Sequence, residues 1–338
     1  MSEAVQLLNY SAHALDELEA LIPKIRADMP GIRDAHRKVV AYLRNSVKFL
    51  LPNCAEMIDM GELRQAHVDM ARLPFDVVAL EAPWVLPDGE GGDKSHALRS
   101  PKRIALCMTM HKDVALAFPD TARFLDEPAG GVVVIPIYWL EHERAWKLPM
   151  GGVFVPHDNE VRDYSPGEVN TPTRLVNQPF IDGGLAPKKL RQFRVAPWIL
   201  LPEMFEASAA QHGHAAVAAG IVGDARDEVS MLLQTGCVLN CSNVRMPEVP
   251  PVAALNKKRV AKGKVPFFSY RVLQVDDPRG AGAGAGGQHA SPRAHLRRGH
   301  IRRLSDRTVW VRAAIVNAGT HAGVVDKTYA VAAKEGAR

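Results

Sequence analysis

Apolar residues near the start of the chain recur with the spacing of an α-helix. The pattern covers residues 4–26, 32–51 and 55–71, and Pro30-Gly31 separates the first two stretches. Side chains three and four positions apart share one face of a helix, so each stretch can bury an apolar face. The sequence therefore predicts three helices that pack together as a helical N-terminal layer.

After residue 72 the pattern changes to short apolar runs that are rich in β-branched residues. Such runs favour strands, and polar or glycine-rich stretches separate them. The expected strands are residues 74–80, 103–110, 131–139 and 146–156, with loops at 87–100 and 157–195. Strands joined by loops favour antiparallel pairing, so we predict a mostly antiparallel, twisted sheet.

Both patterns return in the second half of the chain. Alanine-rich and periodic stretches predict helices at 202–219 and 224–240, and a short helix or turn should follow Pro250-Pro251. Further strands are expected at 267–275 and 308–312. The glycine–alanine segment 279–288 lies between them, and we expect it to be a flexible insertion.

Together these elements predict an α+β fold with a helical N-terminal layer, a central mostly antiparallel sheet, further helices, and a C-terminal basic segment that leads into a sheet strand. The expected regions are 1–72 (helical), 73–201 (mainly β), 202–250 (helical) and 251–338 (basic and β). With 47% hydrophobic and 23% charged residues, the chain can bury a substantial core. We expect the four regions to form one compact domain.

The cysteines and the N-terminus indicate the compartment. Four scattered cysteines are too few for a disulfide framework and favour a reducing environment. Cys237 and Cys241 lie one helical turn apart, and without two further ligands at a matching spacing we expect buried core thiols and no metal. The N-terminus lacks the pattern of a signal peptide, and the chain has no apolar run long enough to cross a bilayer. We therefore expect a cytoplasmic protein with no membrane partner.

Positive charge is concentrated near the C-terminus. Residues 293–312 contain seven arginines and one acid, Asp306. Guanidinium groups offer planar, paired donors that suit phosphates. The candidate nucleic-acid-binding residues in this segment are Arg293, Arg297, Arg298, Arg302 and Arg303.

A second basic cluster precedes the strand that is expected to begin at Phe267. Its candidate nucleic-acid-binding residues are Lys257, Lys258 and Arg259, and Lys262 and Lys264 follow them. If the strands at 267–275 and 308–312 pair, the two clusters form one cationic surface. The alternative is that the charges are solvated or pair internally with aspartates.

Evidence for catalysis in the sequence is weak. His295 and His300 are the only candidates, as general acid and base in RNA cleavage, with structural histidines as the alternative. Known motifs of hydrolases, nucleotide-binding proteins and metalloproteases are absent, so we expect no cofactor. Four tryptophans are candidates either for the core or for an apolar groove that holds a peptide, namely Trp84, Trp139, Trp146 and Trp198.

Residues 254–319 resemble the family of the second described type V-A anti-CRISPR protein. The blocks that carry the resemblance are ALNKK (254–258), PFFSYRV (266–272), PRAHLRRGHIRR (292–303) and VWVRAAIVNAG (309–319), with a less specific match at LPFDVVALEAP (73–83). The chain departs from the family pattern by the insertion at 279–288 and by Ile301, where the family has an aromatic residue.

Phages and conjugative elements carry this family, and its studied member lowers production of the type V-A CRISPR nuclease. It recognises the nascent N-terminal peptide of the nuclease during translation and causes loss of the message. The resemblance therefore implies a binding protein and not an enzyme, whose partners are the nascent N-terminal peptide of a host defence protein, the ribosome and the mRNA. The alternatives are an RNA-cleaving nuclease that uses His295 and His300, and a simple nucleic-acid-binding phage protein.

Overall fold

The computed structural model describes residues 7–58, 63–85, 100–187 and 190–275. Within 276–338 it describes the backbone of four short strands at 295–297, 300–303, 308–311 and 314–316. No helix in the described part of the chain is both long and apolar enough to cross a membrane.

The core of the fold is a mixed sheet of nine strands in the order β11-β12-β1-β2-β3-β4-β6-β9, with β5 added to β4. The strands are β1 (Val47–Leu50), β2 (Val77–Pro83), β3 (Lys102–Thr109), β4 (Gly131–Leu140), β5 (Ala145–Lys147), β6 (Gly151–Pro156), β9 (Ala196–Ile199), β11 (Glu248–Val249) and β12 (Tyr270–Val272). β1 runs parallel to β2 and β12, and the other pairs are antiparallel. The predicted α+β class and mostly antiparallel sheet are thus confirmed.

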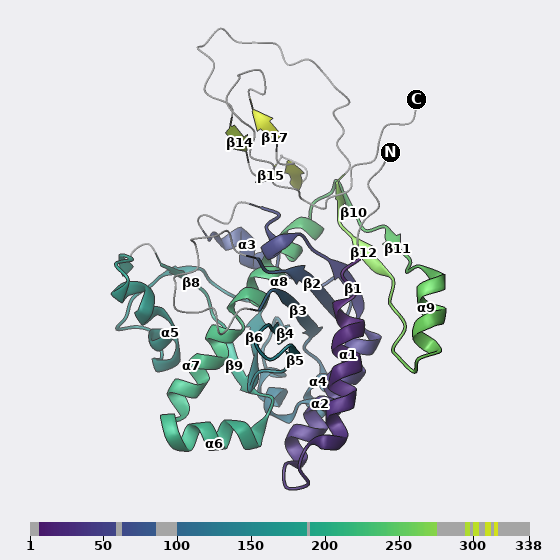
Figure 1. The fold of residues 1–338 in the computed structure, drawn as a ribbon. Helices are drawn as coiled ribbons and strands as arrows, with labels where there is room; N and C mark the ends of the chain where they lie inside the picture. Colours follow the sequence, from purple (N-terminus) through teal and green to yellow (C-terminus); the bar gives the residue numbers. More distant parts are fainter. Residues whose placement is uncertain are drawn as a thin grey trace.

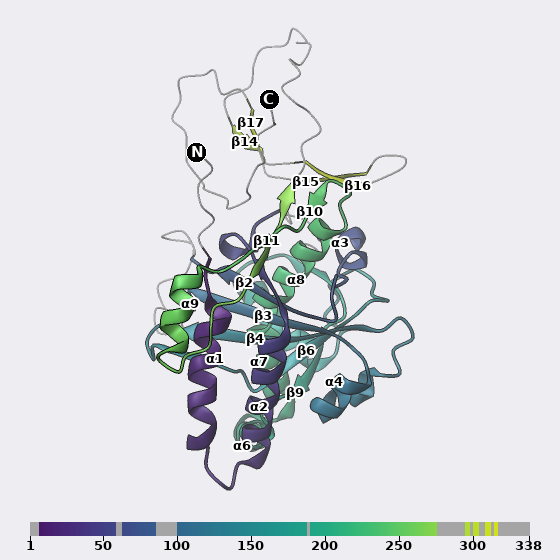
Figure 2. The same ribbon diagram turned by 90° about the vertical axis from the view of Figure 1, so that its right-hand side faces the viewer.

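Helices cover both faces of the sheet (Figures 1 and 2). One face packs against α1 (Tyr10–Leu21), α2 (Pro30–Asn45), α4 (Lys112–Ala117) and the 3-10 turns η1 (Ile22–Lys24) and η4 (Pro119–Phe124). The other face packs against η2 (Asn53–Ala55), α3 (Gln65–Asp69), α6 (Pro202–His212), α7 (His214–Asp224) and α8 (Arg226–Leu239).

The central strands are apolar on both sides because both faces are covered. In β3, Ile104 and Leu106 pack on the α1 side, whereas Ala105 and Cys107 pack on the α8 side, and all four are fully buried. A continuous apolar run is the pattern expected of a strand with two buried faces. This explains why β3 and β4 lie within one residue of the predicted bounds.

Three predicted helices are shorter in the structure, and the first, expected at 4–26, is α1 followed by the turn η1. The helix expected at 32–51 ends at Asn45, and the following residues form β1 between β2 and β12. The hydrogen bonds of β1 to the strands on both of its sides outweigh the helical spacing of its apolar residues. The helix expected at 55–71 is reduced to α3, which packs beside α8 and not with α1 and α2.

The region expected to be irregular, 157–195, contains regular structure. It forms α5 (Thr171–Asp182), which packs against α7, and a small hairpin of β7 (Arg162–Asp163) and β8 (Arg191–Gln192). Asn170 caps α5, since its side chain accepts a hydrogen bond from the Thr173 N–H.

The C-terminal strands pair differently from the arrangement considered above. The predicted strand at 308–312 is present as β16 (Thr308–Val311), which pairs with β15 (His300–Arg303). β14 (His295–Arg297) pairs with β17 (Ala314–Val316), and β10 (Val244–Arg245) pairs with β13 (Gln274–Val275). The strands at 267–275 and 308–312 therefore do not pair with each other. The segment 279–288 lies outside the described residues.

Candidate cationic binding surface

A short helix, α9 (Ala253–Val260), and the turn after it fold back onto α1 as one unit, residues 253–268, which we call the α9 unit. The Asn256 side chain holds its two ends together. It donates to the Phe267 carbonyl at 3.0 Å and accepts from the Phe267 N–H at 2.7 Å. These two bonds join the blocks 254–258 and 266–272, both of which carry the family resemblance.

Arg259 fixes the α9 unit to α1. Its guanidinium pairs with Asp16 at 2.6 Å, donates to the Val265 carbonyl at 2.6 Å and lies 4.3 Å from the centre of the Phe267 ring. Because the side chain is buried and its charge is compensated, Arg259 has a structural role. It is not part of the exposed surface that we predicted to contact nucleic acid.

Four lysines of the α9 unit are exposed. None of them forms an ion pair with another residue in the described part of the chain, and residues 253–264 contain no acid. Figures 1 and 2 both show α9 beside α1, at the edge of the molecule. The unit therefore presents Lys257, Lys258, Lys262 and Lys264 to solvent.

Residues of α1 and β3 lie next to the α9 unit, around His13. The exposed imidazole of His13 packs edge-on against Phe267, with ring centres 5.7 Å apart. Partial burial against Phe267 and its neighbours lowers the pKa of His13, and the nearby cations Arg259, Lys102 and Lys264 lower it further, against the opposite effect of Asp16. Lys102, at the start of β3, lies 4.5 Å from the centre of the Trp139 ring. Residues from α1, β3 and the α9 unit thus form one positively charged region with aromatic rings in it.

A buried polar centre holds α1 in this position. Glu81 of β2 is fully buried and accepts from the N–H groups of Tyr10 and Ser11 at 2.9 and 2.8 Å, and from the Tyr270 hydroxyl at 2.7 Å. Nearby, the ammonium of Lys48 donates to two carbonyls and lies over Phe268. Burial lowers the pKa of Lys48 to about 8, although Glu81 opposes the shift. The centre links the start of α1 to β2 and to β12, which follows the α9 unit.

A second buried ionic cluster lies on the opposite face of the sheet. Arg103 of β3 pairs with Asp227 at 2.9 Å and with Glu228 at 3.0 Å, and it lies over the Trp84 ring at 5.4 Å. Glu228 is fully buried, and one of its oxygens has no hydrogen-bond partner. Burial raises the pKa of Glu228 to about 7 against the opposite effect of Arg103. This cluster joins β3 to the first turn of α8.

Glu228 should make the fold more stable in mild acid than at higher pH. Its pKa is about 7 when folded, against about 4.3 in an unfolded chain. Between these values the folded protein holds a proton that the unfolded chain has lost, so the free energy of unfolding falls as the pH rises. In the unaltered chain the free energy of unfolding should fall by on the order of 3 kcal/mol between these two pH values, and Glu228→Gln should abolish this fall. Denaturant unfolding at several pH values measures it, with the exposed Glu160→Gln as control. An unchanged pH profile in Glu228→Gln would contradict the assignment.

The four candidate tryptophans do not form one groove. Trp146 and Trp198 are 3% and 1% exposed and belong to the core on the α1 side. They are therefore too buried to serve as peptide anchors. Trp84 lies on the α8 side and Trp139 on the α1 side, both half-buried. The core role that we considered is the correct one for Trp146 and Trp198.

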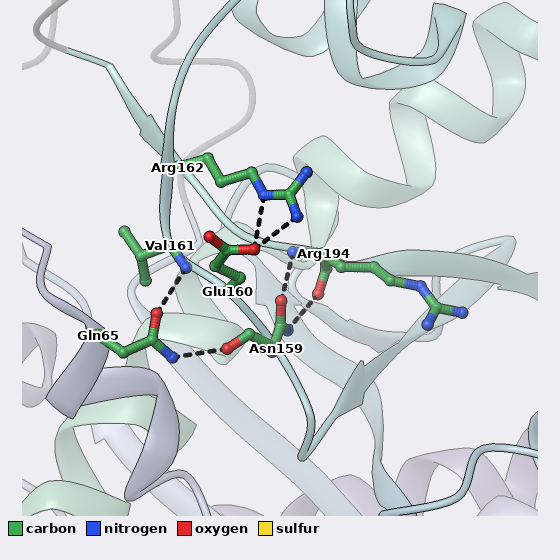
Figure 3. A network of polar contacts seen from close by, with 6 residues as sticks. All are labelled: Gln65, Asn159, Glu160, Val161, Arg162 and Arg194. Carbon is green, nitrogen blue, oxygen red and sulfur yellow. Dashed lines mark hydrogen bonds and ion pairs between the residues drawn. The ribbon is translucent and has the colours of Figure 1, made fainter.

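A polar network holds the segment after β6 in place (Figure 3). Asn159 donates to the Arg194 carbonyl and accepts from the Arg194 N–H, both at 2.8 Å. The Gln65 amide of α3 donates to the Asn159 carbonyl at 2.6 Å and accepts from the Val161 N–H at 2.9 Å. Two side-chain amides thus take the place of strand neighbours, which fixes a segment that sequence patterns indicated to be irregular.

The remaining candidate residues are placed only in part. Arg293 and Arg298 lie outside the described residues. For His295, Arg297, His300, Arg302 and Arg303 the structure describes only the backbone, in β14 and β15.

All four cysteines are buried and unpaired, which confirms the core role of Cys237 and Cys241. The described residues contain no group of three side chains suited to a metal ion.

The chain was compared with protein-family models, with curated proteins and with solved structures. None of the three comparisons gave a match.

Proposed function

We propose that this chain is an anti-defence binding protein of a mobile genetic element, acting in the bacterial cytoplasm. It recognises the N-terminal peptide of a host defence protein while that peptide is being synthesised, and it lowers production of the protein at the level of mRNA. The type V-A CRISPR nuclease is the first candidate target, because the resembling family acts on it.

The α9 unit is the observation that carries the proposal. Two sequence blocks of the resemblance, separated by seven residues, are joined there by the Asn256 side chain. The two blocks therefore belong to one structural unit of the fold, which supports treating them as one region of resemblance. The exposed lysines of the unit suit contact with ribosomal or messenger RNA, whose phosphates dominate such binding.

A reporter in bacteria tests this function. The first codons of the nuclease gene are fused to a fluorescent protein, and mRNA and fluorescence are measured with and without the chain. We expect both to fall, and to fall equally when the codons are replaced by synonymous ones, because the peptide is unchanged. A compensated frameshift, which keeps nearly the same RNA but changes the peptide, should abolish the effect.

The outcome of the frameshift reporter is decisive. If silencing persists with the altered peptide, recognition is of RNA sequence and the proposal is wrong. Purified protein incubated with the message without ribosomes should leave the RNA intact. Cleavage that disappears in a His295→Ala, His300→Ala double variant would instead support the nuclease alternative.

A further inference from the structure

The α9 unit has a surface whose chemistry is not explained by its role in the fold. Asn256 and Arg259 point inward and account for its attachment, so the lysines on the other side are not needed for docking. On a helix, Lys257 and Lys258 are displaced by about 100° and 200° from Asn256 and by about 200° and 100° from Arg259, so they face away from the attachment side. Four exposed lysines in one short segment create a local positive potential that attracts an anionic partner.

Two neighbouring acids of α1 already accept from internal donors. Asp16 is engaged by Arg259 and by the Val265 N–H at 2.9 Å. Glu17 accepts from the Trp146 N–H at 2.9 Å. Arg259 already compensates the charge of Asp16, and neither carboxylate forms an ion pair with a lysine of the α9 unit among the described residues, so the exposed lysines of this unit face solvent without an internal counter-ion.

We propose that single-stranded RNA binds this surface, with phosphates on Lys257, Lys258, Lys262 and Lys264 of the α9 unit and on Lys102 of β3. His13, Phe267 and Trp139 lie within the same surface and supply rings on which unpaired bases can stack. Lysines beside partly exposed aromatic rings are the usual combination for single strands, since every base has a stacking face. The inference rests on the proposed function, which supplies RNA at the ribosome as the partner.

A fluorescently labelled single-stranded RNA of mixed sequence, added to the full chain, tests the surface by anisotropy. The double variant Lys257→Gln, Lys264→Gln should weaken binding about 25-fold near 0.1 M salt, because each single-strand phosphate contact contributes about 0.7 to the salt slope. The slope of log K against log salt should become shallower by about 1.4. The control Lys24→Gln, Lys112→Gln changes two exposed lysines of η1 and α4, with the same loss of charge, and should leave binding unchanged.

Equal weakening in both double variants would mean that only net charge matters, and it would overturn the assignment of this surface. Absence of RNA binding would overturn it as well. So would stronger binding to the same RNA annealed to its complement, or binding to anionic lipid vesicles in place of RNA. The reporter separates the two proposals. Silencing without RNA binding at the α9 unit refutes this inference alone, whereas RNA binding without silencing refutes the proposed function alone.

Discussion

Replacing Glu81 with leucine should destabilise the fold by about 4 kcal/mol, since two buried donors and one half-buried donor would each lose their acceptor at about 1–3 kcal/mol. The donors are the N–H groups of Tyr10 and Ser11 and the hydroxyl of Tyr270. Leucine has nearly the same volume but accepts no hydrogen bond. The shift in the denaturant midpoint of unfolding measures the effect.

Two variants control for side-chain shape and for the individual bond. Glu81→Gln keeps one acceptor oxygen and should cost less than Glu81→Leu. Tyr270→Phe removes a single donor and should cost about 1 kcal/mol. If Glu81→Leu unfolds at the same denaturant concentration as the unaltered chain, the carboxylate does not organise α1 and β12 as described.

This centre also matters for the candidate surface. α1 carries Asp16 and His13, against which the α9 unit packs, and β12 begins two residues after the end of that unit. Glu81 therefore fixes the positions of α1 and β12, the two elements to which the α9 unit is attached. Glu81→Leu should loosen the α9 unit even where the rest of the sheet remains folded.

The central strands could be predicted from the sequence, whereas the sheet order could not. β3 and β4 are long β-branched runs, and local composition is enough to find them. β1 follows closely after α2, and the sequence pattern places it in that helix, since its strand character comes from β2 and β12 on either side. Partners from distant parts of the chain leave no local pattern.

The same limit applies to the candidate surface. The cluster at Lys257 and Lys258 can be predicted from charge alone, because the role of these two lysines does not depend on a partner from a distant part of the chain. The internal role of Arg259 depends on Asp16, which lies 243 positions away. No spacing rule could separate this arginine from the lysines beside it, and none could bring Lys102 and His13 to the same region.

The largest electrostatic effect should come from Arg103. Arg103→Leu leaves Asp227 and the fully buried Glu228 without their cation, and removal of one partner of a buried pair costs about 3–5 kcal/mol. The loss should be greatest above pH 7, where Glu228 is ionised, and smaller in mild acid, where protonation removes the uncompensated charge. Denaturant unfolding at both pH values measures the difference.

A double variant distinguishes loss of the ion pair from loss of packing. Arg103→Leu combined with Glu228→Leu should recover most of the stability, because an apolar pair of similar volume replaces the buried charges at little cost. As a control, Arg26→Leu removes an exposed guanidinium beside Asp28 and should cost less than about 1 kcal/mol. If the double variant is no more stable than Arg103→Leu, the cost lies in the contact of Arg103 with Trp84 and not in the charge of Glu228. The cluster would then hold β3 against α8 by packing alone.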